Sequence, residues 1–179
     1  MDIVDLATQP LEIRTQAAAM LAQAFPHDNG WPTIELGLAE IDWIAKDGFV
    51  HAALDGGQVL GWVGGLPEYR GKVWELHPIV VLDSRRLTGV GRALVHAFEE
   101  TARARGGLTA TLGTDDEFGM TSLSGASLYD DVPGQIASLR DLGRRHPFGF
   151  YRKLGYVVTG VMPDANGLGK PDIYMSKRL

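Results

Sequence analysis

The sequence contains no cysteine, so disulfide bonds, thiolate zinc sites and a cysteine nucleophile are excluded. It has no hydrophobic run as long as a membrane span, and its first residues, Met1–Asp5, lack the basic segment of a signal peptide. It also lacks a basic cluster of the kind that binds nucleic acid. We therefore expect no membrane partner and no nucleic-acid partner, with the cytoplasm as the default location.

The length and composition suit one globular domain. The chain has 179 residues, of which 45% are hydrophobic, and this is enough for a sizeable core. Its net charge of −5 is compatible with a cationic small-molecule substrate, although the same charge is ordinary for a globular domain. No repeat, low-complexity tract or linker divides the chain, so we predict a single domain over residues 1–179.

Hydrophobic periodicity predicts an α+β fold with a central mixed sheet. Apolar residues at helical spacing predict helices at 11–25 and 33–46, the second capped by Thr33. Two strands, FVHAAL and GQVLGWVGG, follow and are joined at the hairpin signal Asp55-Gly56-Gly57. The other predicted elements are strands at 72–81, 108–114, 156–162 and 172–177, a helix stopped by Gly106-Gly107, a short helix through Ile136 and Leu139, and a helix capped by Gly155.

The predicted strand KVWELHPIVV, residues 72–81, carries polar groups that a core strand does not need. The period of two places Glu75 and His77 on one face. Pro78 cannot donate to a sheet ladder, so it indicates a defect or an end of strand pairing. A carboxylate in such a place can bind an ammonium ion and accept or relay its proton. A buried Glu–His pair that satisfies itself, and a simple bulge, are the structural alternatives.

The stretch RRLTGVG, which follows this strand, predicts a pyrophosphate cradle. Gly89 and Gly91 permit tight turning and close approach of a ligand at the start of a helix, where free N–H groups and the helix dipole attract anions. Arg85, Arg86 and Arg92 add positive charge at the same end. An ordinary helix start with solvated arginines is the alternative. The pattern is neither a P-loop nor the Rossmann fingerprint.

These motifs resemble a known family. Arg86-x-x-Gly89-x-Gly91 resembles the acetyl-CoA signature of the GCN5-related N-acetyltransferase (GNAT) superfamily, and FYRKLGY, residues 150–156, resembles its second signature. The stretches WELHPIVV, LGTDD, FYRKLGY and GVMPDANGLGKPDIYMSK resemble the aminoglycoside 6′-N-acetyltransferases, in particular the enterococcal-type branch. The resemblance covers nearly the whole chain, from about Leu6 to the C-terminus.

The resemblance implies an activity and a cosubstrate. A protein of this kind transfers the acetyl group of acetyl-CoA to the 6′-amine of aminoglycoside antibiotics by direct amine attack on the thioester, which confers resistance. It needs no metal, and a homodimer joined through the C-terminal strands is expected. The implied GNAT fold has a central mixed, mostly antiparallel sheet flanked by helices. Its strands are splayed at the cofactor site, where the pantetheine arm lies.

The resemblance also implies roles for individual residues. Glu75 would be the base or proton relay, the N–H of Ile79 would stabilise the oxyanion, and Tyr151 would protonate or hydrogen-bond the departing thiolate. A core position is the structural alternative for Tyr151. The implied cofactor-binding residues are Ile79, Val80, Val81, Arg86, Leu87, Thr88, Gly89, Val90, Gly91, Arg92 and Tyr151.

The implied acceptor site is rich in carboxylates, which suit a substrate with several ammonium groups. Without the resemblance, the acidic residues 115–117 would be interpreted as a solvated loop. The N-terminal stretch FPHDNGWP departs from the branch, because Phe25 and His27 stand where the branch has Trp-Pro followed by acidic residues. Trp31 either replaces the lost stacking surface or packs the two helices together. The implied acceptor-binding residues are Phe25, Glu75, His77, Asp115, Asp116 and Asp172.

The sequence is also compatible with two other functions. The chain could acetylate another amine, such as a polyamine, an amino sugar, or a protein lysine or N-terminus. It could also bind CoA and catalyse nothing. The presence of both Glu75 and Tyr151 favours catalysis, because a pure binding protein needs neither.

Overall fold

The computed structural model describes residues 1–27 and 30–179. Asp28 and Asn29, within the stretch FPHDNGWP, therefore lie outside the described residues. The chain forms two compact units, one of residues 1–110 with Leu179 and the other of residues 111–178. The single domain that we predict from the sequence covers both units and stays a prediction.

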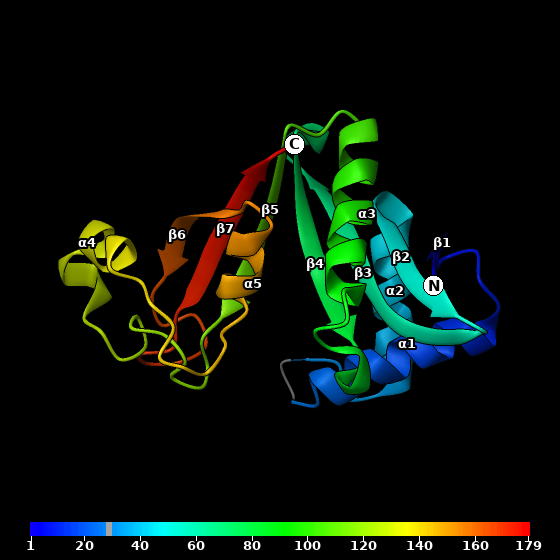
Figure 1. Ribbon diagram of the computed structural model, residues 1–179, viewed down its shortest axis with the longest axis horizontal. Helices are drawn as coiled ribbons and strands as arrows, with labels where there is room; N and C mark the ends of the chain where they lie inside the picture. Colours follow the sequence, from blue (N-terminus) through cyan, green and yellow to red (C-terminus); the bar gives the residue numbers. More distant parts are fainter. Residues whose placement is uncertain (28–29) are drawn as a thin grey trace. The chain divides into compact units, whose positions relative to one another are not determined.

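The first unit is built on four antiparallel strands in the order β1-β2-β3-β4. Helices α1 and α2 lie on one face of these strands, and α3 lies on the other (Figure 1). The elements are β1 (Asp2–Asp5), α1 (Leu11–Ala24), α2 (Ile34–Asp47), β2 (Phe49–Asp55), β3 (Gln58–Glu68), β4 (Val73–Val81) and α3 (Val90–Ala104), with 3₁₀ turns at Tyr69–Gly71 and Asp83–Arg85.

Local signals in the sequence explain several of these boundaries. Thr33 caps α2, because its hydroxyl accepts the N–H of Leu36 at 3.3 Å. The β2–β3 hairpin turns at Gly56 and Gly57, whose φ angles are 56° and 84°. Two successive positive φ angles match the twist of an antiparallel pair, and glycine adopts them without steric cost. The predicted start of α2 and the predicted hairpin are therefore confirmed.

Large aromatic side chains pack between the strands of the first unit and the helices on both faces. Trp62 on β3 is fully buried among residues of α1 and α2, and its indole N–H donates to the carbonyl of Ala17 at 2.9 Å. On the α3 face, the ring of Phe49 lies 5.2 Å from that of Trp74 and 5.6 Å from that of Phe98. Burial of one such side chain stabilises the fold by about 1.5–3 kcal/mol, so β4 is held firmly between the two layers.

A β-bulge interrupts the pairing of β4 with β3. His77 and Pro78 together stand opposite the single residue Gly64. A side chain at Gly64 has no room, because its Cβ would lie 2.2 Å from the carbonyl oxygen of His77. Before the bulge, Glu75 pairs with Leu66, which packs toward α1 and α2. Paired residues of an antiparallel ladder share a face, so Glu75 also faces these two helices.

Because the bulge adds one residue to β4, the odd-numbered residues of this strand face α1 and α2 before the bulge and α3 after it. A Cβ on Gly61 of β3 would lie 3.2 Å from Val81 and 3.0 Å from Leu94 of α3, so Val81 faces α3. Pairing resumes at Ile79 and continues to the end of the strand. The predicted ladder defect at Pro78 is thus confirmed as a bulge, whereas pairing with β3 does not end there.

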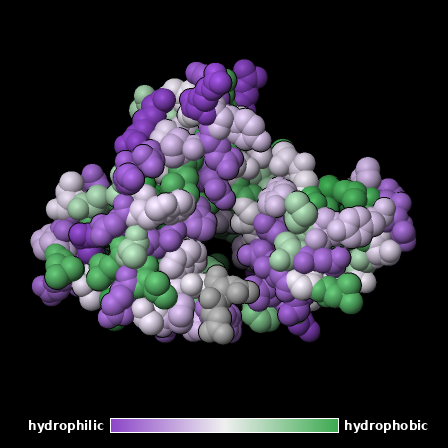
Figure 2. All heavy atoms as spheres, turned by 180° about the vertical axis from the view of Figure 1, so that it is seen from behind, coloured by the Kyte–Doolittle hydropathy of each residue, from purple (hydrophilic) through white to green (hydrophobic). Residues whose placement is uncertain are grey.

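The second unit contains three strands in the order β5-β7-β6, of which β6 and β7 are antiparallel. Three large hydrophobic residues of β6 and β7, Val157, Met162 and Tyr174, are exposed. On the face of the molecule in Figure 2, hydrophobic residues lie singly or in small groups among hydrophilic ones. The elements are β5 (Thr109–Asp115), a 3₁₀ turn (Leu128–Asp130), α4 (Val132–Ala137), α5 (Phe148–Lys153), β6 (Val157–Met162) and β7 (Asp172–Arg178).

The α+β class predicted from the sequence is confirmed, and the pairings β1–β2, β2–β3, β3–β4 and β6–β7 are all antiparallel. Strand β1 was not predicted from the sequence; it spans only Asp2–Asp5 and pairs with Leu54 to His51 of β2. Four residues are too few for a period to be recognised. The partner strand lies far along the chain, and β1 is stabilised by that pairing and not by a local signal.

Candidate active site

Glu75 lies half-buried on β4, on the face toward α1 and α2. Burial raises the pKa of its carboxyl group above the ordinary value, His77 opposes this increase, and the negative charge of Glu68 adds to it. Within the described part of the chain, no hydrogen bond or ion pair engages the Glu75 side chain. A carboxylate that is partly desolvated and unengaged is a stronger base than a solvated one.

His77, two residues along the same strand, contacts a carboxylate on a helix. Its Nε2 lies 3.3 Å from a carboxylate oxygen of Glu40 on α2. The alternative of a Glu75–His77 pair that satisfies itself is therefore not what the structure shows. The direct contact of His77 is with Glu40.

Two aromatic residues stand beside this group. The indole N–H of Trp31 donates to Glu40 at 3.0 Å, and the Trp31 ring lies 5.7 Å from the ring of His77. The rings of Phe25 and Trp31 form a T-shaped pair with their centroids 5.6 Å apart, and 40% of Phe25 is exposed. The first unit thus brings Phe25, His77 and Glu75 of the predicted acceptor set to one side of its strands, together with Trp31 and Glu40.

Glu40 was not predicted from the sequence as a residue of the site. It lies on the predicted helix 33–46, on which an acidic residue is normally solvated. No sequence motif connects it with His77, which is 37 positions away. The only available signal was its place between the apolar positions Leu38 and Ile41, which turns part of its side chain toward the core.

The backbone at the end of β4 offers hydrogen-bond donors away from β3. Leu82 donates its N–H to Leu60, so Leu82 and, by alternation, Val80 present their N–H groups to β3. The N–H groups of Ile79 and Val81 then point to the opposite edge of the strand. Val80 is buried in the core, whereas Ile79 and Val81 are half-buried. β3 therefore does not use the N–H groups of Ile79 and Val81, and their role in binding a ligand stays a prediction.

The turn after β4 fits an anionic ligand. Gly89 has φ 99°, and a Cβ there would meet nothing within 4 Å, so the residue is required for its backbone angle. The first α-helical hydrogen bond of α3 joins Ala93 N–H to the carbonyl of Gly89. The N–H groups of Val90, Gly91 and Arg92 precede it and have no acceptor within the helix. They can bind a pyrophosphate group.

The other residues of the turn are exposed. Leu87 has φ 63° and is 92% exposed, and the hydroxyl of Thr88 donates to the carbonyl of Arg85 at 2.6 Å. Arg86 forms a 2.8 Å ion pair with Asp83. Arg92 is exposed at the start of α3. The predicted turn and its cationic side chains therefore lie together at one end of this helix.

In the second unit, Asp115 and Asp116 have different environments. Asp115 is exposed and accepts a hydrogen bond from the amide of Asn166. Asp116 is fully buried, and its carboxylate accepts the N–H of Met120 together with the N–H and hydroxyl of Thr121, at 2.6–2.8 Å. Its oxygens are used to hold the loop that follows β5. The geometry thus favours Asp115 as a ligand and Asp116 as its support.

Asp172, at the start of β7, lies against Gly113 of β5. A Cβ on Gly113 would be 2.5 Å from Oδ2 of Asp172, so the glycine makes room for this carboxylate. Asp172 is half-buried. The roles predicted for Asp115, Asp116 and Asp172 in acceptor binding stay predictions.

Tyr151 lies on α5 with its ring buried between other aromatic rings. Phe150 and Tyr156 meet it edge-on at 5.1 and 5.7 Å. Burial raises the pKa of its hydroxyl far above the ordinary value, and within the described residues that hydroxyl has no hydrogen-bond partner. The group therefore stays protonated at neutral pH and can act as a donor. Its position in an aromatic cluster fits the structural alternative as well.

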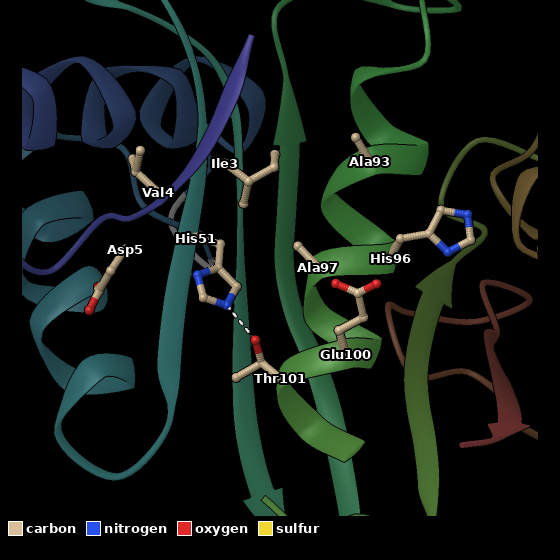
Figure 3. Close-up of a pocket in the computed structure, with 9 residues that line it drawn as sticks. All are labelled: Ile3, Val4, Asp5, His51, Ala93, His96, Ala97, Glu100 and Thr101. Carbon is tan, nitrogen blue, oxygen red and sulfur yellow. Dashed lines mark hydrogen bonds between the residues drawn. The ribbon is translucent and has the colours of Figure 1, made fainter. Parts of the chain in front are cut away.

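A separate groove of about 520 Å³ lies between β1, β2 and α3 (Figure 3). Within it, His51 points toward α3 and its Nε2 lies 2.8 Å from the hydroxyl of Thr101. Burial lowers the pKa of His51, while Asp5 opposes the decrease. No residue of the predicted catalytic or binding set lines this groove. It is therefore distinct from the site on β4.

Within residues 1–27 and 30–179, no group of three or more histidine, aspartate or glutamate side chains could hold a metal ion. No helix of that part of the chain combines the length and the apolar character needed to cross a membrane.

Comparisons with known proteins identify the family. The model described as "Acetyltransferase (GNAT) family" matches residues 15–123. None of the curated proteins compared with this chain matches it significantly. An aminoglycoside 6′-N-acetyltransferase complexed with coenzyme A is 36% identical, with a TM-score of 0.91. The aminoglycoside 6′-N-acetyltransferase from Enterococcus faecium is 36% identical, with a TM-score of 0.90.

A third solved structure, of an aminoglycoside 6′-acetyltransferase type Ii, is 32% identical with a TM-score of 0.76. In all three comparisons, 99% of this chain and 97% of the other chain are covered. The resemblance predicted from the turn at residues 86–91 and from FYRKLGY is thereby confirmed. The chain belongs to the acetyltransferase (GNAT) family.

Proposed function

We propose that this protein transfers the acetyl group of acetyl-CoA to the 6′-amine of aminoglycosides. The observation that carries the proposal is the half-buried, unengaged carboxylate of Glu75, which faces the same side of the strands as His77, Phe25 and Trp31. Its support from outside the chain is the 36% identity to an aminoglycoside 6′-N-acetyltransferase complexed with coenzyme A.

Glu75 would prepare the amine for attack. An aliphatic amine is an ammonium ion at neutral pH and has no free electron pair. Glu75 would hold this cation and take one proton from it, directly or through a water molecule, leaving the nitrogen lone pair free to attack. The raised pKa of Glu75 brings its proton affinity closer to that of the amine. Such general-base assistance typically contributes about 10²–10⁴ in rate.

The cofactor residues would divide into two groups. Residues 86–92 would hold the pyrophosphate through the free N–H groups of α3 and the side chains of Arg86 and Arg92. Val80, buried in the core, would hold the strand in place for Val81 to bond the pantetheine arm. Acetyl-CoA, when bound, supplies the acetyl group as a thioester.

Two further donors would act on the reacting atoms. The N–H of Ile79 would donate to the thioester oxygen, where negative charge develops as the amine attacks. The hydroxyl of Tyr151 would donate its proton to the sulfur as the carbon–sulfur bond breaks. Asp115 and Asp172 would bind further ammonium groups of the drug, with Asp116 as the support of their loop.

The first test is thiol release from acetyl-CoA with a panel of amines. The panel holds kanamycin, tobramycin, an aminoglycoside with a 6′-hydroxyl group, spermidine and a lysine peptide. We expect turnover of the 6′-amino drugs and none of the 6′-hydroxyl analogue. Turnover of spermidine or of the peptide alone would move the function to another amine. Acetyl-CoA binding without turnover of any amine would favour a protein that only binds CoA.

We also propose a homodimer joined through the C-terminal strands. Val157, Met162 and Tyr174 on β6 and β7 are large and exposed, and an apolar contact would cover them. Sedimentation of the purified protein tests this. We also propose a cytoplasmic location and a role in antibiotic resistance, because both follow from the proposed acetylation of aminoglycosides. Growth of cells that express the protein, in the presence of kanamycin, tests the role in resistance.

A further inference from the structure

Glu40 occupies a position that the proposed reaction does not yet explain. It comes from α2, yet its carboxylate reaches His77 on β4 and Trp31 in the segment before the helix. One oxygen lies 3.3 Å from Nε2 of His77, and the other accepts the indole N–H of Trp31 at 3.0 Å. Only 17% of its side chain is exposed. Both oxygens of this partly buried carboxylate therefore contact residues that lie beside Glu75, on the same face of the strands.

The carboxyl group of Glu40 is ionised. Burial acts to raise its pKa, but the hydrogen bonds from His77 and Trp31 outweigh this effect and leave the pKa below the ordinary value. An ionised carboxylate can only accept hydrogen bonds. The nitrogen that faces it, Nε2 of His77, must therefore carry a hydrogen atom. In a neutral imidazole, the other nitrogen, Nδ1, then has a free lone pair.

This tautomer matters for an acceptor amine. Nδ1 has no hydrogen-bond partner among the residues that the structure describes. His77 and Glu75 lie two residues apart on the same face of β4, so both can present a free acceptor to a ligand on that face. An ammonium ion is a donor with no acceptor capacity. A lone pair at Nδ1 can accept one of its hydrogens, whereas an N–H there would repel it.

We propose that Glu40 is a positioning residue of the acceptor site, which fixes His77 in the Nε2–H tautomer so that Nδ1 and Glu75 together accept hydrogen bonds from the acceptor ammonium. The inference rests on the proposed acetylation of an amine. Glu40 touches neither reactant and acts through His77. Its second oxygen holds Trp31, so one side chain sets both the polar and the aromatic surface presented to the acceptor.

The decisive variant is Glu40→Gln, which has nearly the same shape. Its amide oxygen can still accept the indole N–H of Trp31, so its NH₂ group then faces Nε2 of His77. Nε2 must accept that hydrogen bond, and the ring proton moves to Nδ1. We expect the ¹⁵N NMR signals of His77, assigned by their loss in His77→Ala, to change from the Nε2–H to the Nδ1–H pattern.

Glu40→Gln should change the kinetic parameters of the acceptor amine and leave those of acetyl-CoA unchanged. Loss of one charge-assisted hydrogen bond should lower kcat/KM for the acceptor by about tenfold to hundredfold. The KM for acetyl-CoA should not change, because no predicted cofactor residue touches Glu40. Glu40→Asp, which keeps the charge, should retain the Nε2–H pattern and more activity than Glu40→Gln. Glu35→Gln, an exposed carboxylate on the same helix, is the matched control and should behave as wild type.

Three results would overturn the proposal. The first is an unchanged tautomer of His77 in a folded Glu40→Gln protein. The second is a changed tautomer with an unchanged kcat/KM for the acceptor. The third is equal loss of activity in Glu40→Gln and Glu40→Asp, which would indicate a packing role alone. The NMR readout needs no substrate. If no amine in the panel is acetylated, the proposed function and the acceptor role fail together, while NMR still decides the tautomer.

Discussion

Replacement of Glu75 by glutamine tests the proposed reaction most directly. The variant keeps the length and shape of the side chain and removes its ability to accept a proton. Because the amine would then have to lose its proton to solvent, we expect kcat/KM for the acceptor to fall by about 10²–10⁴. This corresponds to about 2.7–5.4 kcal/mol of activation free energy. The KM for acetyl-CoA should stay unchanged, because Glu75 lies apart from residues 79–92.

The same substitution should not destabilise the protein at neutral pH. The carboxylate of Glu75 is half-buried and has no hydrogen-bond partner among the described residues, so folding removes it from water without compensation. Glutamine carries no charge and avoids this cost. Because burial raises the pKa of Glu75 in the folded state, its contribution to stability is present below the unfolded pKa and is lost as pH rises through the folded pKa.

The raised pKa of Glu75 predicts the outcome of two measurements. The pH profile of kcat/KM in the wild type should have an acidic limb from Glu75, with activity falling as the pH decreases through a pKa above the ordinary 4.5. That limb should be absent from the residual activity of Glu75→Gln. The melting temperature of the variant, relative to wild type, should be higher at pH 7.5 than at pH 4.

Wild-type activity of Glu75→Gln would refute the role of Glu75 as the base. A loss of acetyl-CoA binding in proportion to turnover would refute it as well. Glu68→Gln is the matched control. Its charge adds to the increase in the pKa of Glu75, so its removal should shift the acidic limb to lower pH and leave the maximal rate unchanged. Loss of turnover in Glu68→Gln as well would indicate that negative charge in general, and not a base at Glu75, supports the reaction.

Three further substitutions test other parts of the site. Gly89→Ala should raise the KM for acetyl-CoA and lower the free energy of unfolding by about 1–2 kcal/mol, because an alanine at φ 99° is strained even though its Cβ has room; kinetics and a urea titration measure both. Tyr151→Phe removes the proposed proton donor, so kcat should fall by about 10²-fold. The melting temperature should equal that of the wild type, because the buried hydroxyl has no hydrogen-bond partner among the described residues. Asp116→Ala leaves three donors without their acceptor and should lower the free energy of unfolding by at least about 3 kcal/mol in a urea titration, whereas the exposed Asp115→Asn should change only the KM of the acceptor.

The predictions from the sequence succeeded where the cause is local. Thr33 caps α2 because its hydroxyl reaches a backbone N–H three residues later, and the Gly56-Gly57 turn needs only backbone angles that glycine allows. The same holds for Gly89 at the start of α3. The family was recognised from such short stretches as well, because a phosphate-binding turn keeps its residues within a few positions of one another.

The predictions were incomplete where the cause is a contact between distant residues. Asp116 follows Asp115 in an acidic run that is typical of solvated loops, yet it is fully buried because Thr121 and Met120 return to it. The strand β1 depends on a partner some fifty residues later. In both cases the sequence contains the residues but not the pairing, since hydrogen bonds of this kind have no periodicity.

The sequence by itself determined the α+β class, the family, the glycine turn at the start of α3 and the presence of a carboxylate and a histidine on one face of β4. Only the tertiary structure decided how those two residues are used. The bulge at His77 and Pro78 keeps Glu75 toward α1 and α2 and turns Val81 toward α3. The packing of α2 on the same face brings Glu40 to His77. A strand's pattern defines which residues share a face, but the partner that meets that face is chosen by the packing of the whole unit.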